Sequence, residues 1–291
     1  MDFLLRVQAP LTPDEWQALD AAVTEAVRGS LVCRRFVPLY GPLGPSAQSV
    51  PDDRYEEGQT GGVDLLGESG GGRVRLSVRR FLPLPLIYKD FVLAWRDIAL
   101  SRQLHTALDT SGAVGAAQAV AQTEDDLIVN GNPALELPGL RTVEGVNRLP
   151  LGDWSQPNEA FGAVVRATET LVGQGFNGPY TVLVGPLLYA QLNRMFGNSG
   201  LLALEQVQKL ARGGVEQSPV VPGGVALVLQ ASPDTLDLAV GLDVVTGYLG
   251  PENLNHTCRV LESAVPRIKQ PRAIVVLEGA GESQPQRGRR A

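Results

Sequence analysis

The hydrophobic pattern near the start of the chain predicts an amphipathic helix over residues 13–28. One apolar stripe at helical spacing is formed by Trp16, Leu19, Val23 and Val27. Thr12 is a favourable N-cap, Glu15 completes a capping box with it, and Gly29 follows as a stop signal. We expect the stripe to pack on the core of the chain itself. The alternative is that part of the stripe frames a groove for a partner.

The chain is rich in turn-forming residues between positions 41 and 72, and short segments there alternate as strands do. The pattern predicts a hairpin in which the glycine run 70–72 joins a strand around Val63 and Leu65 to one around Val74 and Val78. Such a two-stranded arm has little to pack on and is marginal alone in water. We therefore expect it to lie against another domain or another subunit.

The middle of the chain predicts a long strand over residues 86–95 and a helix over residues 110–130. Most apolar positions of this helix are small, with alanine at 113, 117 and 121, so it is expected to pack closely on several sides. Gly131 marks its end.

The second half predicts an α/β unit over residues 151–229. Its expected helices are 158–172, 187–194 and 201–211, and its expected strands are 180–184 and 225–229. Four successive strands follow, at 236–240, 244–249, 258–265 and 273–277. The polar tail 279–291 is expected to be disordered.

Composition narrows the class of protein. Of 291 residues, 44% are hydrophobic and 19% charged, which suits folded domains rather than a disordered chain. No apolar run reaches the ~18 residues of a membrane helix, and the first residues do not resemble a signal peptide, so we expect a cytoplasmic protein. The net charge of −6 offers no electrostatic footprint for nucleic acid. Two histidines and two cysteines cannot build the usual zinc clusters.

Motifs for catalysis are weak. Residues 67–71 match G-x-S-x-G around Ser69, but they fall in the glycine-rich hairpin, where the nucleophile-elbow context of strand and helix is missing. The acidic run Glu124-Asp125-Asp126 points in different directions on a helix and is interpreted as a solvated or intersubunit face. Cys33 and Cys258 are interpreted as buried small hydrophobes. We therefore expect no catalytic residues, no metal site and no cofactor.

The order of these parts resembles the encapsulins, shell proteins of bacterial nanocompartments that share the fold of tailed-phage major capsid proteins. The likeness runs from Met1 to about Glu278. The motifs that carry it are Met1-Asp2-Phe3-Leu4, Ala9-Pro10-Leu11-Thr12, Arg34-Arg35-Phe36-Val37, Glu124-Asp125 before Gly131, and Gly178-Pro179-Tyr180-Thr181.

The resemblance implies an α+β, phage major-capsid-like fold. Its parts would be an N-terminal helix and arm (1–49), an extended hairpin loop (50–83), a peripheral domain with the spine helix (84–140 and 233–282), an inserted axial domain (141–232) and a disordered tail (283–291). Many copies would assemble into an icosahedral shell, with the hairpin reaching across a neighbouring subunit. The shell size is left open.

The resemblance also implies site residues. A targeting peptide of a cargo protein would bind a groove involving Leu19, Val23, Val27, Arg34, Leu39, Asp243, Val244 and Val245. A small pore would be lined by Gly197, Asn198, Ser199, Gly200 and Leu201.

Three segments look most like the iron-storing encapsulins with larger shells: 87–91, 150–154 and 267–269. This implies a ferritin-like ferroxidase as cargo, with a dye-decolourising peroxidase as the alternative. Some relatives carry a flavin near an aromatic at the position of Trp95, which we interpret here as a buried core residue. Two other hypotheses are a defective-prophage capsid that packages nucleic acid and a hydrolase that uses Ser69.

Overall fold

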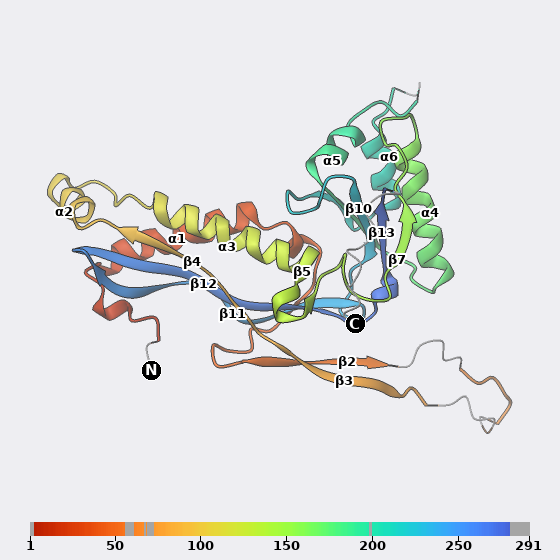
Figure 1. The fold of residues 1–291 in the computed structure, drawn as a ribbon, viewed down its shortest axis with the longest axis horizontal. Coiled ribbons are helices and arrows are strands. Elements are labelled where there is room, and N and C mark those ends of the chain that lie inside the picture. Colours follow the sequence, from red (N-terminus) through yellow and green to blue (C-terminus); the bar gives the residue numbers. More distant parts are fainter. Residues whose placement is uncertain (1–2, 56–60, 67, 69–72, 198–199, 280–291) are drawn as a thin grey trace, which may run out of the picture.

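The computed structural model describes residues 3–55, 61–66, 68, 73–197 and 200–279. Figure 1 shows an elongated molecule with three parts. Two long helices lie over a sheet to form the body, an α/β unit stands at one end, which we call the second unit, and a two-stranded arm runs beneath. Within the described ranges, none of the helices combines the length and apolar character that crossing a membrane requires.

The N-terminal helix α1 spans Pro13–Ser30 and begins as the sequence predicts. The Thr12 hydroxyl accepts a hydrogen bond from the Glu15 backbone N–H, and the Glu15 carboxylate accepts one from the Thr12 N–H. This capping box satisfies two of the N–H groups that every helix start leaves open. A short 3-10 turn, η1 (Arg6–Gln8), precedes the helix, and a second, η2 (Cys33–Arg35), follows it.

The body sheet has four strands in the order β1-β11-β12-β4. They are β1 (Leu39–Tyr40), β11 (Leu236–Glu252), β12 (Asn255–Ile268) and β4 (Leu86–Leu93). The two strands predicted at 236–240 and 244–249 are one strand, β11, because register shifts around Leu242 interrupt the alternation without ending the pairing with β12. The strand predicted over 86–95 ends at Leu93. Helix α2 (Trp95–Leu104) begins two residues later.

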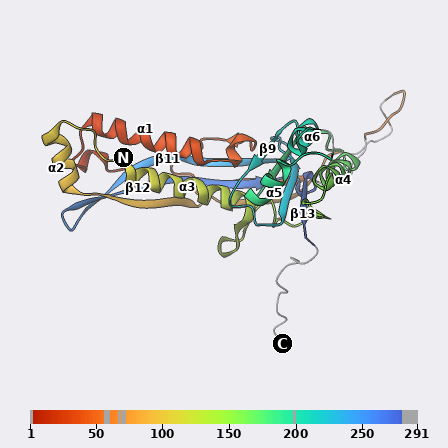
Figure 2. The same cartoon turned by 90° about the horizontal axis from the view of Figure 1, so that it is seen from above.

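The spine helix α3 (Ser111–Asn130) packs on β4, β12 and α1. Figure 2 shows α1 and α3 side by side along the sheet. Ala113, Ala117 and Ala121 are fully buried, as the small-residue pattern predicts. Gly131 caps the helix with φ +74°, a conformation that favours glycine, and a Cβ at Gly139 would collide with the Gly131 backbone nitrogen. Short strands β5 (Gly131–Asn132) and β6 (Leu137–Pro138) pair there around the turn η3 (Pro133–Leu135).

The arm pairs β2 (Ser49–Tyr55) with β3 (Leu76–Pro83). The predicted hairpin is present, but the predicted position of its first strand was wrong. Val63 and Leu65 lie in an exposed loop, and β3 pairs instead with β2, which precedes that loop. The pairing is fixed near the body, where Val50 and Leu82 are buried opposite each other. The glycine run 70–72 and Ser69 lie outside the described residues.

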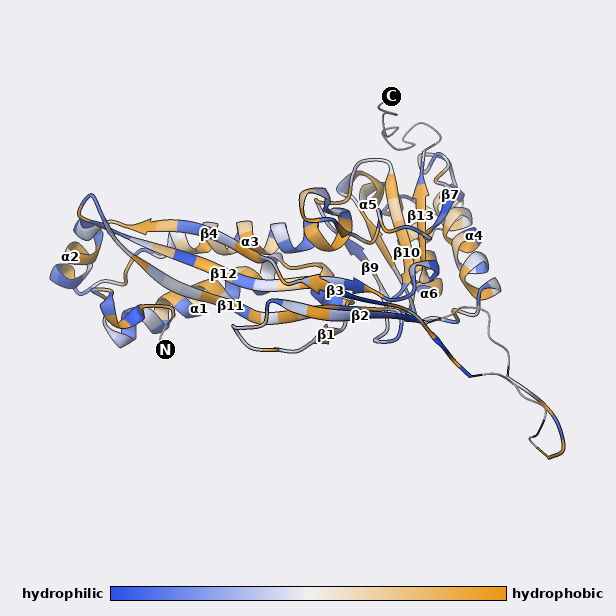
Figure 3. Ribbon diagram, turned by 60° about the horizontal axis from the view of Figure 1, so that its bottom comes forward, coloured by the Kyte–Doolittle hydropathy of each residue, from blue (hydrophilic) through white to orange (hydrophobic). Residues whose placement is uncertain are grey.

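The second unit is a sheet of five strands in the order β7-β13-β10-β8-β9. The strands are β7 (Asn147–Pro150), β8 (Tyr180–Val184), β9 (Gly214–Gln217), β10 (Val225–Gln230) and β13 (Ile274–Glu278), and η4 (Pro271–Ala273) precedes β13. The helices are α4 (Glu159–Gly173), α5 (Pro186–Leu192) and α6 (Ala203–Leu210). β10 and β13 carry continuous apolar runs, which Figure 3 shows in orange, because both faces of this sheet are buried.

β13 falls in the segment 233–282 that we assigned to the peripheral domain, yet its hydrogen bonds go to β10 and β7 of the second unit. One buried cluster also crosses from this sheet to the body, with Leu227 and Ile274 on one side and Ile128 and Leu238 on the other. The tail from residue 280 onward lies outside the described residues.

Candidate binding site

The outward face of α1 borders a cavity of about 1210 Å³. The helix presents mostly exposed polar and small residues there, because Leu19 and Val23 of its apolar stripe are buried in the core; Trp16, also of the stripe, lines the cavity. The other wall is the segment around η1. The lining residues are Arg6, Val7, Ala9, Leu11, Pro13, Trp16, Gln17, Asp20, Ala21, Thr24, Glu25, Arg28 and Gly29.

Arg6 holds the segment around η1 in place. Its Nε donates to the Thr246 carbonyl on β11 at 2.8 Å, and its two terminal nitrogens donate to the Asp20 carboxylate on α1. The guanidinium also lies over the Trp16 ring, 4.5 Å from the centroid. One side chain thus ties η1 to both the helix and the sheet, so the cavity has a fixed wall.

A second cavity of about 310 Å³ adjoins the first. Thr24 and Arg28 line both, so the two form one continuous depression along α1. The remaining lining residues are Val27, Leu31, Arg34, Arg35, Asp243 and Val244. Four residues that the resemblance named therefore meet here: Val27, Arg34, Asp243 and Val244.

Arg34 is surrounded by three carboxylates from three elements. It donates to both oxygens of Glu124 on α3, to Glu262 Oε2 on β12 at 2.6 Å, and to Asp243 Oδ1 on β11 at 2.8 Å. Glu124 and Glu262 are fully buried, whereas the Asp243 side chain is 66% exposed. Each of the three Arg34 nitrogens thus already donates to a carboxylate, which leaves its guanidinium poorly suited to anchor an anionic ligand.

The protonation of this cluster follows from its surroundings. Burial raises the pKa of Glu262 well above its ordinary value, and the neighbouring Glu124 carboxylate raises it further, more than Arg34 lowers it. Burial and the neighbouring carboxylate thus both favour the protonated form of Glu262. For Asp243, burial opposes ionisation, but hydrogen bonds from Arg34 and from its neighbouring backbone N–H leave the pKa lowered. The cluster presents one charged carboxylate, that of Asp243, to the cavity.

The acidic run at 124–126 is the solvated face that we expected only at Asp126, which is exposed. Glu124 and Asp125 are buried, at 0% and 2% exposure. The Asp125 carboxylate accepts hydrogen bonds from the backbone N–H groups of Val32 and Cys33, at 2.9 and 2.8 Å, and so caps the turn η2. Burial raises the pKa of Asp125 and of the Cys33 thiol. Cys33 and Cys258 are buried and unpaired, as expected.

The other predicted groove residues lie elsewhere. Leu19 and Val23 are 0% and 3% exposed and belong to the core beneath α1, so they do not reach either cavity. Leu39 is 54% exposed on β1. Neither Leu39 nor Val245 is among the described residues that line the depression. Sequence reasoning missed the residues around Ala21 and Thr24, because small and polar residues on the outer side of a helix look like an ordinary solvated face.

The predicted pore loop lies in the second unit between α5 and α6. Gly197 and Gly200 have positive φ values of +54° and +75°, and Leu201 is 44% exposed. The Phe196 N–H donates to the Leu201 carbonyl at 2.7 Å, which closes the loop. Asn198 and Ser199 lie outside the described residues.

The remaining candidates for chemistry are separate. Trp95 is 44% exposed at the start of α2, not the buried core residue that we expected, because the chain turns into a helix two residues after β4. His256 contacts the Tyr248 hydroxyl at 3.1 Å, and His105 caps the end of α2. Among the described residues, histidine, cysteine and acidic side chains form no group of three placed to hold a metal ion.

Curated relatives cover nearly the whole chain. It is 44% identical over 283 residues to the type 1 encapsulin shell protein EncA of Myxococcus xanthus, covering 97% of this chain and 99% of that protein. It is 43% identical over 268 residues to the diheme-cytochrome–encapsulin shell fusion protein of Kuenenia stuttgartiensis, covering 92% of this chain and 74% of that one. A ferritin-like–encapsulin shell fusion protein of Pyrococcus furiosus is 28% identical over 76% of this chain and 60% of that protein.

Solved structures share the fold. The virus-like particle from Pyrococcus furiosus superposes with a TM-score of 0.74 at 25% identity, covering 90% of this chain and 99% of that one. The capsid of the myovirus phage XM1 gives a TM-score of 0.64 at 12% identity, covering 84% and 90%, which shows a common phage-capsid fold. The family model described as "Encapsulating protein for peroxidase" matches residues 1–265, and the chain belongs to this family of encapsulin shell proteins.

Proposed function

We propose that copies of this chain assemble in the cytoplasm into a closed icosahedral shell that encloses a cargo enzyme and carries out no chemistry itself. The enclosed enzyme would be a ferritin-like ferroxidase, so that the particle stores iron and protects against oxidative stress. A dye-decolourising peroxidase is the alternative cargo.

The feature of the structure that most supports the assembly proposal is the arm. It leaves the body as an isolated two-stranded ribbon, and apolar side chains on it are exposed: Tyr55 56%, Leu76 42%, Val78 48% and Phe81 64%. A free hairpin of this kind is marginal in water and exposes backbone edges that invite pairing. Contact with a neighbouring copy would cover both the side chains and the edges.

The cargo proposal is supported by the depression along α1. Its two adjoining cavities have aliphatic walls at Val7, Leu11 and Val27. Three carboxylates also line them, Asp20 and Glu25 in the larger cavity and Asp243 in the smaller one. A short extended peptide bearing leucine or isoleucine side chains fits this chemistry, because a few apolar anchors in pockets give most of the binding energy. The ferritin-like relative, in which cargo and shell are one chain, supports the choice of cargo class.

Negative-stain electron microscopy of the chain purified alone tests the assembly proposal. Uniform hollow particles are the expected result, and their diameter distinguishes a small from a large icosahedron. A monomer or dimer would overturn the proposal. Ultraviolet spectra of the same particles test the rival prophage capsid, since packaged nucleic acid would give strong absorbance at 260 nm that a protein shell lacks.

Ala21→Arg tests the docking site. Ala21 lines the large cavity and is exposed, so arginine should fill the cavity and leave the helix intact. On co-expression with the ferritin-like cargo, we expect roughly tenfold less packaged cargo per particle, as a loss of about 1.4 kcal/mol in affinity would give. The measurement is the cargo-to-shell ratio on a denaturing gel.

Ala18→Arg is the matched control, because Ala18 is an exposed α1 alanine outside both cavities. Normal loading in both variants would refute the docking site, and normal loading in the control alone supports it. Val23→Asp is unsuitable for this test, since it would place a charge in the core. Failure of wild-type shells to load a ferritin-like protein, together with loading of a peroxidase, would select the alternative cargo.

A further inference from the structure

The arm joins the body through two kinds of contact. Apolar side chains at its root, Val50, Leu82 and Leu84, are buried in the body core, at 1%, 6% and 8% exposure. Apolar packing of this kind is non-directional and holds the root without defining the angle at which the ribbon leaves. A directional contact lies one residue further out, where Arg267 on β12 donates to the Pro51 carbonyl on β2 at 3.0 Å.

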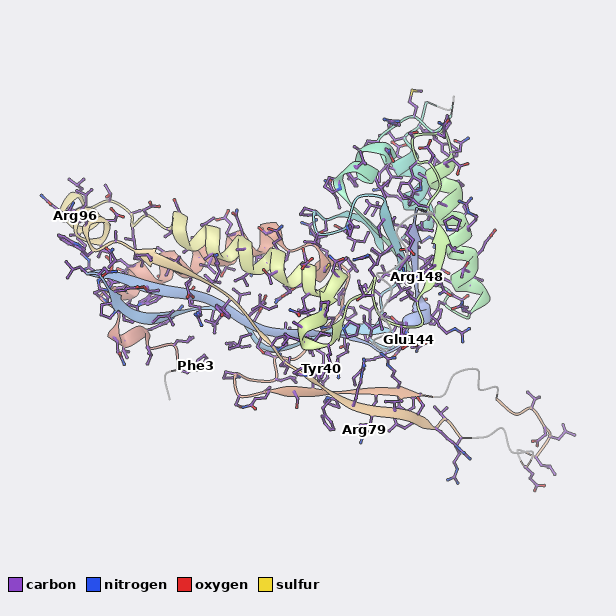
Figure 4. The ribbon with its side chains drawn as sticks, in the orientation of Figure 1. Phe3, Tyr40, Arg79, Arg96, Glu144 and Arg148 are labelled. Atoms are coloured by element: carbon purple, nitrogen blue, oxygen red, sulfur yellow. The ribbon has the colours of Figure 1, made fainter. Side chains whose placement is uncertain are left out.

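Arg267 is itself held on three sides. Its Nε and one terminal nitrogen donate to the two oxygens of Asp237 on β11, both at 2.7 Å. Lys269 shares the same carboxylate at 2.7 Å, and the Tyr40 ring lies 4.0 Å beneath the guanidinium. Arg267 and Asp237 are 6% and 4% exposed. Figure 4 shows Tyr40 at the junction of arm and sheet, with Arg79 further along the arm. The remaining nitrogen, which meets Pro51, is therefore fixed in direction.

We propose that Arg267 is the positioning residue that sets the direction of the arm, and through it the curvature with which neighbouring subunits meet. This inference rests on the proposed shell function. A small change in the direction of the arm moves its end far. β3 has 8 residues, so at ~3.3 Å per residue the ribbon extends roughly 26 Å. A rotation of about 10° at its root therefore moves its end by roughly 5 Å. A shift of that size changes where the arm meets its neighbour.

Arg267→Lys is the test, because lysine keeps the charge and loses the planar fork and the stacking on Tyr40. Arg259→Lys is a control with the same contact geometry at a more exposed pair, whose side chains are 28% and 42% exposed against 8% and 5% for those of Arg267 and Asp237. Arg259 lies on the same strand, binds Asp90 through the same two nitrogens, and lies 4.0 Å from the centroid of the Tyr88 ring. Both of these partners are on β4 and not on the arm.

In negative-stain electron micrographs we expect particles of wild type and of Arg259→Lys to have a single diameter. We expect particles of Arg267→Lys to have several diameters. Hydrogen exchange on the same particles should be roughly tenfold faster in the arm strands of Arg267→Lys alone. A single diameter class with unchanged arm exchange in Arg267→Lys would overturn the inference. The absence of particles in wild type would instead overturn the proposed function.

Tyr40→Leu keeps the test decisive if Arg267→Lys fails to fold. It leaves the buried ion pair intact and removes only the ring beneath the guanidinium. We expect a broadened diameter distribution here too. One diameter class in Tyr40→Leu would then count against the positioning role.

Discussion

At the scale of single residues, the cluster around Arg34 decides how the N-terminal segment is fixed to the body. Its partners Glu124 and Glu262 are 90 and 228 positions away in the sequence. No local pattern reveals such partners, which is why the acidic run at 124–126 suggested a solvated face. A buried charge is recognised only once its partner is known, and sequence reasoning could name Arg34 and Asp243 only through resemblance to a family.

Glu262→Gln is expected to change the pH dependence of stability. Because the pKa of Glu262 is raised in the folded protein, that protein binds more protons than the unfolded chain above pH 4.5, and stability falls as pH rises through this window. Glutamine does not titrate. The melting temperature of the variant relative to wild type should therefore increase by roughly 2–4 °C between about pH 5 and about pH 8.

The measurement is the melting temperature of both proteins in thermal denaturation across this pH range. Glu252→Gln is the control, since Glu252 is an exposed carboxyl at the end of β11. Its difference from wild type at each pH gives the baseline. A difference for Glu262→Gln that does not rise above this baseline with pH would mean that the pKa of Glu262 is not raised in the folded protein.

At the scale of elements, the features that could be predicted are those that depend on residues close together in the sequence. The start of α1 and its buried stripe were predicted from the capping box and the helical spacing, both of which act within a few residues. The strand Tyr180–Val184 was predicted to the residue for the same reason. The arm was mispaired because Val63 and Leu65 alternate just as a strand does. The observed partner of β3 is selected by contacts distant in sequence: the burial of Val50 against the body and the cross-strand ion pairs Asp52–Arg80 and Asp53–Arg79.

Leu19→Ala tests whether the α1 stripe belongs to the core. Leu19 is fully buried, so removing its side chain should lower the free energy of unfolding by about 2–5 kcal/mol. Urea denaturation at fixed protomer concentration measures this, with the exposed Thr24→Ala as the control. A loss below about 1 kcal/mol would indicate that the stripe is mobile and open to a partner.

At the scale of the whole molecule, the body and the second unit have buried cores of their own and are linked by a third cluster, whereas the described part of the arm has no buried apolar cluster beyond its root. The fold class could be predicted from the order of elements, because that order resembles a known family. The way the arm leaves the body could not, since it depends on Arg267, Asp237 and Pro51, which lie far apart in sequence.

The double variant Leu76→Asp, Val78→Asp tests whether assembly of the shell requires the arm. Both residues are exposed on β3, so the body should fold normally, while burial of two carboxylates against a neighbour would cost several kcal/mol. We expect at least about a tenfold loss of assembled particles in size-exclusion chromatography, with the protomer remaining folded by circular dichroism. Ser77→Asp is the single-charge comparison. Ser77 lies at the register irregularity between these positions, and its hydroxyl donates to the Arg54 carbonyl at 2.9 Å. Normal assembly of the double variant would mean that Leu76 and Val78 stay in solvent in the particle, and would refute the role of these side chains in the contact between subunits.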